Sequence, residues 1–247
     1  MERIFIIPCK YSDEKPFIYG CVDSIRKYYT DKIVIIDSDS DDTFYLDLLT
    51  NQYDNIDVLN IKNKNFMTGA IWKVYEKYDS DTYYCLHDSI KVLGNLLNYE
   101  KYDVTTILKS EDWKWPYHGD TRNHDWAKSK IEHTKIKFKD GGFDEIIGPM
   151  FIIKKQILDE LKDLKFNEIL PSNKSEMEMM ERLWGMAFDF LKIKFTENVV
   201  LKNRCSGSEK EIIKINNYKT GKDVTIDVKT CKHQKDDLVI KYWSGRK

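Results

Sequence analysis

Several widespread active-site fingerprints are missing from this chain of 247 residues. It contains neither G-x-G-x-x-G nor a P-loop, so the dinucleotide-binding and ATPase classes lack the glycines that cradle their phosphates. It also contains neither G-x-S-x-G nor H-E-x-x-H, the patterns typical of α/β-hydrolase and zinc-peptidase sites. Any catalytic site must therefore use residues outside these motifs.

Cysteine is scarce and badly placed for cross-linking. The chain has 5 Cys, widely spaced and with no C-x-x-C pair, so neither a disulfide framework nor a zinc knuckle is indicated. Cys9 and Cys85 stand at the ends of apolar runs, which is typical of buried thiols. These features fit a reducing compartment best.

No apolar run reaches the roughly 20 residues that a transmembrane helix needs. The chain begins almost directly with the apolar segment 4–8, which has no small-residue cleavage site after it and is predicted to be a strand rather than a signal peptide. We therefore expect a soluble, cytoplasmic protein without a transmembrane segment, located in the host cytoplasm if its source is viral.

An excess of charge of one sign is also lacking. With 40 Lys+Arg against 41 Asp+Glu the net charge is −1, which argues against a general nucleic-acid-binding protein. The 41% of hydrophobic residues and a length of 247 suit one α/β domain with a sizeable core. No repeat or linker divides the chain, so a single domain over residues 1–247 is the expectation.

The first ninety residues alternate between two periodicities. Apolar runs predict strands, and apolar residues at helical spacing predict helices between them. Such alternation, with connections of this length, predicts a mostly parallel, doubly wound sheet with flanking helices. The predicted strands are 3–7 (ended by Pro8), 32–36, 56–61 and 82–86, and the predicted helices are 17–29, 44–49 and 68–78.

The second half is less regular. An aromatic, turn-prone segment at 113–120 and a break at 141–145 precede an apolar stretch, 146–153, that reads as a strand interrupted by Gly-Pro. The remaining predicted elements are helices at 156–164 and 176–191 and weaker strands at 211–215, 224–228 and 238–242.

The most informative segment is the end of the second predicted strand. The β-branched run 33–36 stops at residues 37–43, a cluster of carboxylates and hydroxyls. The carboxyl ends of buried parallel strands are where open α/β sheets bind ligands. We expect Asp37 to accept a hydrogen bond from a nucleotide base or ribose, and Asp42 or Thr43 to cap the next helix.

The fourth predicted strand ends similarly, on His87-Asp88-Ser89. Asp88 is a hard oxygen ligand suited to Mg²⁺ or Mn²⁺, and His87 is acceptable to Mn²⁺. The alternative is that Asp88 caps a helix starting at Ser89. Two strands that deliver carboxylates to one edge favour a nucleotide and metal site there.

These strand-end segments resemble the nucleotide-binding half of GT-A-fold glycosyltransferases. Those enzymes often carry Asp-Asp-Gly-Ser-x-Asp-x-Thr after the second strand, and Asp37, Ser40, Asp42 and Thr43 lie near the matching positions, with a one-residue deletion. A later strand of the family ends on a metal-binding Asp-x-Asp, from which residues 87–89 depart. Residues 148–151 and 180–185 resemble the acceptor half of small viral and bacterial members.

The resemblance covers residues 3–190 and implies a division of labour. Residues 1–93 would bind a nucleotide sugar, most simply a UDP-sugar, 94–195 would bind a glycan or another hydroxyl acceptor, and 196–247 would be a C-terminal elaboration. A divalent cation, Mn²⁺ or Mg²⁺, would act as a Lewis acid on the diphosphate, with Asp88 and His87 as its ligands. The expected donor-binding residues are Pro8, Asp37, Ser38, Asp39 and Asp88.

The predicted helix 176–191 supplies the expected catalytic base. Glu178 and Glu181 are three residues apart and so share a helix face. An inverting glycosyl transfer needs one carboxylate within reach of the acceptor hydroxyl. Glu181 is the first choice and Glu178 the reserve, with Arg182 as the cation expected to keep the base ionised. The alternative is a solvated acidic face.

Aromatic rings in the 113–120 segment could stack on the C–H faces of an acceptor sugar. The named residues are Trp113, Trp115, Tyr117 and Asp120, the last being a second conceivable base. The alternative is a loop cluster that plugs the edge of the core. Near the C-terminus, His233 is a weaker metal-ligand hypothesis, and a closing segment could place Lys241 or Arg246 on the diphosphate.

Two rival functions remain open. A nucleotidyltransferase would also use strand-end carboxylates and Mg²⁺, but it should have a Gly-, Arg- and Lys-rich phosphate loop after the first strand, where segment 8–12 contains no Gly. A catalytically inactive glycan-binding protein would retain the fold without the chemistry.

Overall fold

A computed structural model describes residues 2–114, 121–195, 199–201, 208–231 and 237–243, with backbone only for 110–114, 121–123, 208 and 231. A six-stranded sheet forms its centre, in the order β3-β2-β1-β4-β9-β6. Strands β1 to β4 and β6 run parallel, and β9 is antiparallel to both of its neighbours. The strands are β1 Arg3–Cys9, β2 Lys32–Asp37, β3 Ile56–Leu59, β4 Thr82–Cys85, β6 Val104–Thr106 and β9 Phe151–Lys154.

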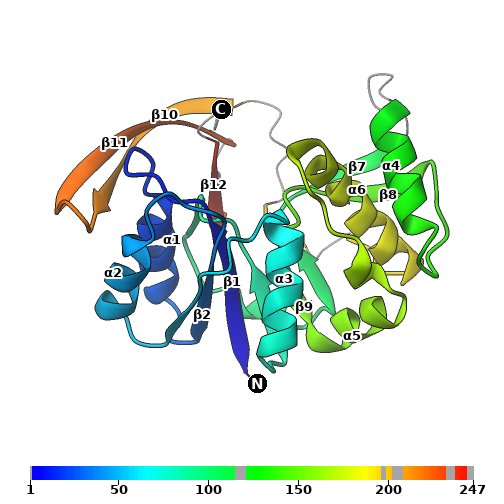
Figure 1. Cartoon of the computed structure of the whole chain (residues 1–247), viewed down its shortest axis with the longest axis horizontal. Helices are drawn as coiled ribbons and strands as arrows, with labels where there is room; N and C mark the ends of the chain where they lie inside the picture. Colours follow the sequence, from blue (N-terminus) through cyan, green and yellow to red (C-terminus); the bar gives the residue numbers. More distant parts are fainter. Residues whose placement is uncertain (1, 115–120, 196–198, 202–207, 232–236, 244–247) are drawn as a thin grey trace.

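Helices cover both faces of this sheet (Figure 1). Helices α1 (Phe17–Arg26) and α2 (Phe44–Gln52) lie on one face, and α3 (Phe66–Lys77), α5 (Lys155–Asp163) and α6 (Lys174–Phe190) lie on the other. The predicted mixed α/β class with a mostly parallel central sheet is therefore confirmed.

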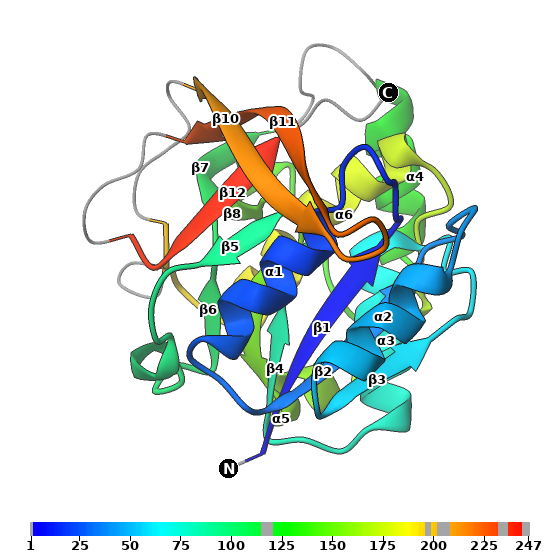
Figure 2. The ribbon, with the colours of Figure 1, turned by 90° about the vertical axis from the view of Figure 1, so that its left-hand side faces the viewer.

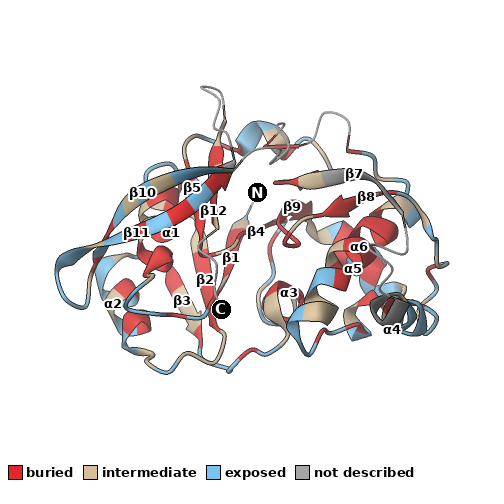
Figure 3. Cartoon of the chain, turned by 90° about the horizontal axis from the view of Figure 1, so that it is seen from above, coloured by how far each residue is buried: buried red, intermediate tan, exposed pale blue. Residues whose placement is uncertain are grey.

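The alternation of side chains along β1 divides the core in two. Ile4 and Ile6 belong to the apolar cluster beneath α3, α5 and α6, whereas Phe5 and Ile7 belong to the cluster beneath α1 and α2. Both faces are apolar because both are covered, which is why the strand reads as a continuous hydrophobic run. Figure 3 shows the buried central strands between the more exposed outer segments.

The expectation that Pro8 ends the first strand is wrong, because β1 continues to Cys9 with Pro8 opposite Ile36 of β2. Leu86 N donates to Ile6 O on the β4 side, so the nitrogen of Pro8, two residues on, faces the same side. The pairing with β4 has ended by that point, at Cys85. A missing N–H therefore costs no ladder hydrogen bond.

A second sheet, in the order β10-β11-β12-β5, packs against α1 (Figure 2). It joins three C-terminal strands to a short strand that follows β4 in the sequence. Its members are β5 Ile90–Val92, β10 Ser208–Asn217, β11 Lys222–Cys231 and β12 Val239–Trp243. The three predicted C-terminal strands are confirmed, with β10 and β11 longer than expected.

The middle of the chain departs most from the prediction. Segment 141–145, expected to be a break, lies in β8, which pairs irregularly with β7. The strand expected at 146–153 is interrupted at Gly-Pro, as predicted: β8 ends at Ile146 and β9 begins at Phe151, and Gly148 in the turn between them has a positive φ of 66°. The elements here are η1 Leu97–Tyr99, β7 Lys109–Lys114, α4 Thr121–Ile131, β8 Gly141–Ile146 and η3 Phe166–Glu168.

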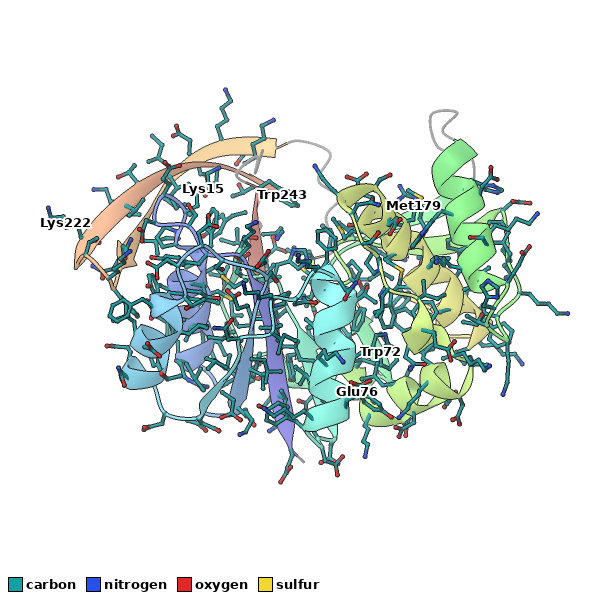
Figure 4. All side chains as sticks on the ribbon, viewed as in Figure 1. Lys15, Trp72, Glu76, Met179, Lys222 and Trp243 are labelled. Carbon is teal, nitrogen blue, oxygen red and sulfur yellow. The ribbon has the colours of Figure 1, made fainter. Side chains whose placement is uncertain are left out.

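Helix α6 is held tightly in place. Its Trp184 is fully buried, donates to Thr68 Oγ1 at 3.1 Å, and its ring centroid lies 6.1 Å from that of Trp72. Trp72 extends from α3 on the side where α5 and α6 lie (Figure 4). A Cβ on Gly185 would lie 1.8 Å from the carbonyl oxygen of Asp144, so β8 approaches the helix backbone directly. No helix among the described segments combines the length and apolarity needed to cross a membrane.

Candidate active site at the carboxyl edge of the sheet

The sheet has a switch point between β1 and β4. From β1 the chain proceeds outward through β2 and β3 on one side, then returns to place β4 on the other side. In open α/β sheets, ligands bind beyond the carboxyl ends of the strands at such a point. Backbone hydrogen bonds connect the segments that follow β1, β2 and β3 at this edge. Ser38 N donates to Cys9 O at 2.7 Å, and Asn63 N donates to Asp37 O at 2.9 Å.

Asp37 lies at this edge but is only 1% exposed. Its carboxylate accepts hydrogen bonds from Asp39 N at 3.1 Å, Ser40 N at 3.2 Å and the Tyr45 hydroxyl at 3.1 Å. These bonds fold the loop after β2 back on itself. The contacts make Asp37 an organiser of the loop, and direct binding of a nucleotide by its carboxylate stays a prediction.

Asp39 is one of the solvent-facing carboxylates of the same loop. Its φ is 62°, a left-handed conformation that Asp tolerates better than most residues. The side chain is 42% exposed, with Lys62 Nζ at 3.9 Å and Lys64 Nζ at 4.0 Å. Asp39 is therefore better placed than Asp37 to contact a ligand. The N-cap residue of α2 is Thr43, which makes no side-chain cap hydrogen bond, whereas Oδ1 of Asp42, one residue earlier, accepts from Phe44 N at 2.8 Å.

The segment after β4 leads into a strand. Strand β5 begins at Ile90, so the alternative in which Asp88 caps a helix at Ser89 is wrong. A lysine from the C-terminal strand β12 reaches this segment. Lys241 is 6% exposed, and its Nζ lies 2.9 Å from His87 Nδ1 and 2.6 Å from Ser89 Oγ.

Asp88 is 5% exposed and lines a cavity of about 390 Å³ between α1, β5, β10 and β12. Phe17, Cys21, Ile215 and Tyr242 supply apolar parts of its wall. Among the described residues, the lining includes none from the loop 37–43 and none from α6. Asp88 therefore lies on the α1 side of the carboxyl edge of the central sheet.

His87 and Glu181 meet at the turn between β8 and β9. A Cβ on Gly148 would lie 2.9 Å from His87 Cε1, so the imidazole packs directly over this glycine. Gly148 N donates to Glu181 Oε1 at 2.8 Å. The Gly-Pro turn therefore brings the end of β4 and helix α6 to one place, although nothing in the local sequence pairs His87 with Glu181.

The environment of Glu181 raises its pKa to about 8, first because burial disfavours the carboxylate and second because Glu145 adds negative charge nearby. The hydrogen bond from Gly148 N and the charge of Arg182 oppose this rise. A carboxyl group perturbed in this way at a sheet edge marks a candidate functional residue.

Arg182 does not have the role expected of it. Its Nη2 lies 2.9 Å from Glu145 Oε1, with both side chains buried, and its Nη1 donates to Glu178 O at 2.5 Å. The expectation that Arg182 keeps Glu181 ionised is wrong, because its charge is outweighed by burial and by Glu145. Burial also raises the pKa of Glu145. Glu178 is exposed, as the solvated-face alternative predicts.

The described residues give the expected Mn²⁺ or Mg²⁺ one carboxylate candidate, the buried Asp88, and a metal held there stays a prediction. Within the described part of the chain, no group of three or more His, Cys, Asp and Glu side chains could hold a metal ion. An ammonium group has donors only, so the contact with Lys241 uses the Nδ1 lone pair of His87. A neutral imidazole has no second lone pair for a metal.

Several sequence-predicted residues lie outside the described residues: Trp115, Tyr117, Asp120, His233 and Arg246. For Trp113 only the backbone is described, in β7 opposite Phe143. Pro8 lies half-buried in β1 and Ser38 half-buried just after β2, at the edge where donor contacts were expected. Sequence analysis missed Glu145, whose only signal was its place beside the Gly-Pro turn.

Comparisons with known proteins find distant structural similarity only. No family model matches the chain and no curated protein matches it. The solved structure of S. aureus TarS 1–349 is 14% identical, covers 75% of this chain and 56% of that one, and has a TM-score of 0.42. The complex of S. aureus TarS 1–349 with UDP is 12% identical, covers 73% and 54%, and has a TM-score of 0.43. The chain spans about half the length of these structures. TM-scores this low do not identify what the chain does.

Proposed function

We propose that this protein is a glycosyltransferase that uses a nucleotide sugar, most simply a UDP-sugar, and a hydroxyl acceptor such as a glycan. The observation that carries the proposal is Glu181, whose pKa is raised to about 8 where the β8–β9 turn meets His87 at the carboxyl edge. Sheets of this topology bind ligands at that edge, and a base poised near neutral pH suits proton removal from a hydroxyl. The resemblance of residues 37–43 and 180–185 to GT-A enzymes supports the same function.

In the proposed reaction Glu181 is the general base. The acceptor oxygen attacks the anomeric carbon while the bond from that carbon to the phosphate oxygen breaks. The electron pair of that bond leaves with the nucleoside diphosphate, and the acceptor proton passes to the Glu181 carboxylate. A single displacement of this kind inverts the anomeric centre. The loop after β2, with Asp39 exposed and Asp37 bracing it, holds the nucleotide.

The first test is release of nucleoside diphosphate from a panel of UDP-, GDP- and other nucleotide sugars. We expect wild-type protein to hydrolyse or transfer one donor slowly. Glu181→Gln should lose at least about 100-fold in rate, the usual scale for a general base. Glu178→Gln, one turn away and exposed, should keep its activity.

The other outcomes separate the rival functions. Nucleotide-sugar binding without turnover would favour the alternative of a catalytically inactive glycan-binding protein. Release of pyrophosphate from a nucleoside triphosphate would indicate nucleotidyl transfer. Equal losses in the two glutamate variants would contradict the assignment of Glu181 as the base.

A further inference from the structure

The ammonium group of Lys241, from the C-terminal strand β12, lies at the end of β4 where a divalent metal was expected. Lys241 follows His87 by 154 residues, yet its Nζ lies 2.9 Å from His87 Nδ1. The pairing of β12 with β5, in which Lys241 lies opposite Ile90, puts it there. The backbone bond from Tyr242 N to Ser89 O at 2.9 Å and the contact from Nζ to Ser89 Oγ at 2.6 Å fix its position.

The contact assigns the proton of His87. Because an ammonium can only donate, Nδ1 is the acceptor, and the neutral ring carries its hydrogen on Nε2. On that side the ring packs over Gly148, with Nε2 3.3 Å from the position of a Cβ there. His87 is partly exposed and lies beside the turn that binds Glu181, whereas Lys241 is buried.

We propose that Lys241 and His87 together provide the positive charge and the N–H donor for a diphosphate leaving group, so that binding and departure of this group need no divalent cation. The inference rests on the proposed function. When the bond between the anomeric carbon and the phosphate oxygen breaks, the oxygen keeps the electron pair. The preorganised ammonium and the N–H of His87 stabilise that negative charge. Lys241 is a positioning and charge-supplying residue, and His87 is the group that touches the diphosphate.

The test measures binding rather than turnover. Affinities for UDP and uridine, and for GDP and guanosine as a second pair, are measured calorimetrically in EDTA and again with Mn²⁺. We expect the wild-type protein to prefer one diphosphate over its nucleoside in EDTA, with little change on adding Mn²⁺. Lys241→Met should weaken the diphosphate by about 10- to 100-fold, the scale of a charge-assisted hydrogen bond, and leave the nucleoside unchanged.

A matched control lies on the neighbouring strand. Lys91 is exposed on β5, opposite Ile240, and Lys91→Met removes the same charge one register position away. Its affinities should equal those of the wild type. Lys241→Arg keeps the charge and should retain most of the preference for the diphosphate. If Lys241→Met does not fold, the wild-type affinities in EDTA and those of Lys241→Arg still show whether diphosphate binding needs a divalent cation.

Nitrogen-15 NMR of the wild-type protein gives a readout that is independent of ligands. The chain has only 5 His, and His87 should show a bare Nδ1 and a protonated Nε2. A protonated Nδ1 would overturn the inference. So would diphosphate binding that disappears in EDTA, or a Lys241→Met variant that weakens nucleoside and diphosphate equally; the glycosyltransferase proposal would survive all three. Failure of both pairs to bind would instead remove the inference, together with UDP- and GDP-sugars as donors in the proposed function.

Discussion

The sequence identifies Glu181 as a candidate base, but its pKa depends on residues that surround it only in the folded chain. The helical spacing alone makes Glu178 and Glu181 nearly equal candidates for the base. In the folded chain Glu178 is exposed, whereas Glu181 accepts a bond from Gly148 N and lies close to the negative charge of Glu145. These surroundings, rather than the residue type, distinguish Glu181 from Glu178 as the proposed base.

The activity should depend on pH through Glu181. Since its pKa is about 8, the carboxylate needed for catalysis is the minor form at pH 7 and the major form at pH 9. We expect kcat/KM to rise with pH through an apparent pKa near 8 and to level off above it. A pH–rate profile of nucleoside diphosphate release checks this, and a rate that is flat from pH 6 to 9 would argue against Glu181.

The same group should make stability fall as pH rises. The folded pKa, about 8, lies above the ordinary value of 4.5, so between these pH values the folded state holds a proton that the unfolded state has released. Glu181→Gln should therefore be neutral at pH 4 and stabilising at pH 8, by about 1–3 kcal/mol. Urea unfolding at both pH values measures the difference, which should be absent for Glu178→Gln.

At the scale of elements, the register between α6 and β8 places the candidate base. The two elements touch through Gly185, whose missing side chain lets the Asp144 carbonyl approach. Glu181 lies one turn earlier on the same helix. A sequence pattern identified this helix, but the strand that packs on it was expected to be a break, because glycines at 141 and 142 resemble a turn.

Two helical glycines should respond in opposite ways to the same substitution. Gly185→Ala places a Cβ against backbone at 1.8 Å and should destabilise the protein by about 3 kcal/mol or more. Gly20→Ala on α1 meets only the Ile215 side chain at 3.5 Å and should stabilise by about 0.5–1 kcal/mol. Chemical denaturation of both variants tests the packing, and a neutral Gly185→Ala would refute the close approach.

At the scale of the whole molecule, the C-terminal sheet connects distant parts of the chain to the carboxyl edge of the central sheet. Strand β12 brings Lys241 to the end of β4, and the β10–β11 hairpin brings Lys219 to the loops after β1 and β2. Lys219 Nζ lies 3.2 Å from Asp13 Oδ2 and 2.6 Å from Asp42 Oδ2. The hydrogen bond from Tyr11 and then the one from Lys219 lower the pKa of Asp13, and the hydrogen bond from Lys219 lowers the pKa of Asp42.

Removing the hairpin cation should have a small, salt-sensitive effect. Lys219→Met should lower the thermal midpoint at low ionic strength, because two carboxylates lose their partner. The difference should vanish in about 1 M salt, where the Debye length is about 3 Å. It should also shrink as the pH falls below 3.8 and the two carboxyl groups take up protons through their lowered pKa values. Scanning calorimetry measures it. A midpoint shift that survives high salt would indicate a packing role instead.

The sequence by itself determined the alternating half of the fold, from β1 to β4, because each of those strands and helices is specified by local periodicity and its ends by neighbouring turn residues. It also placed polar residues at the correct edge, since parallel strands end together. Only the tertiary structure decided that Asp37 braces its own loop, that Arg182 pairs with Glu145, and that Lys241 meets His87. Those outcomes depend on burial and on contacts between residues far apart in the chain, which no local pattern encodes.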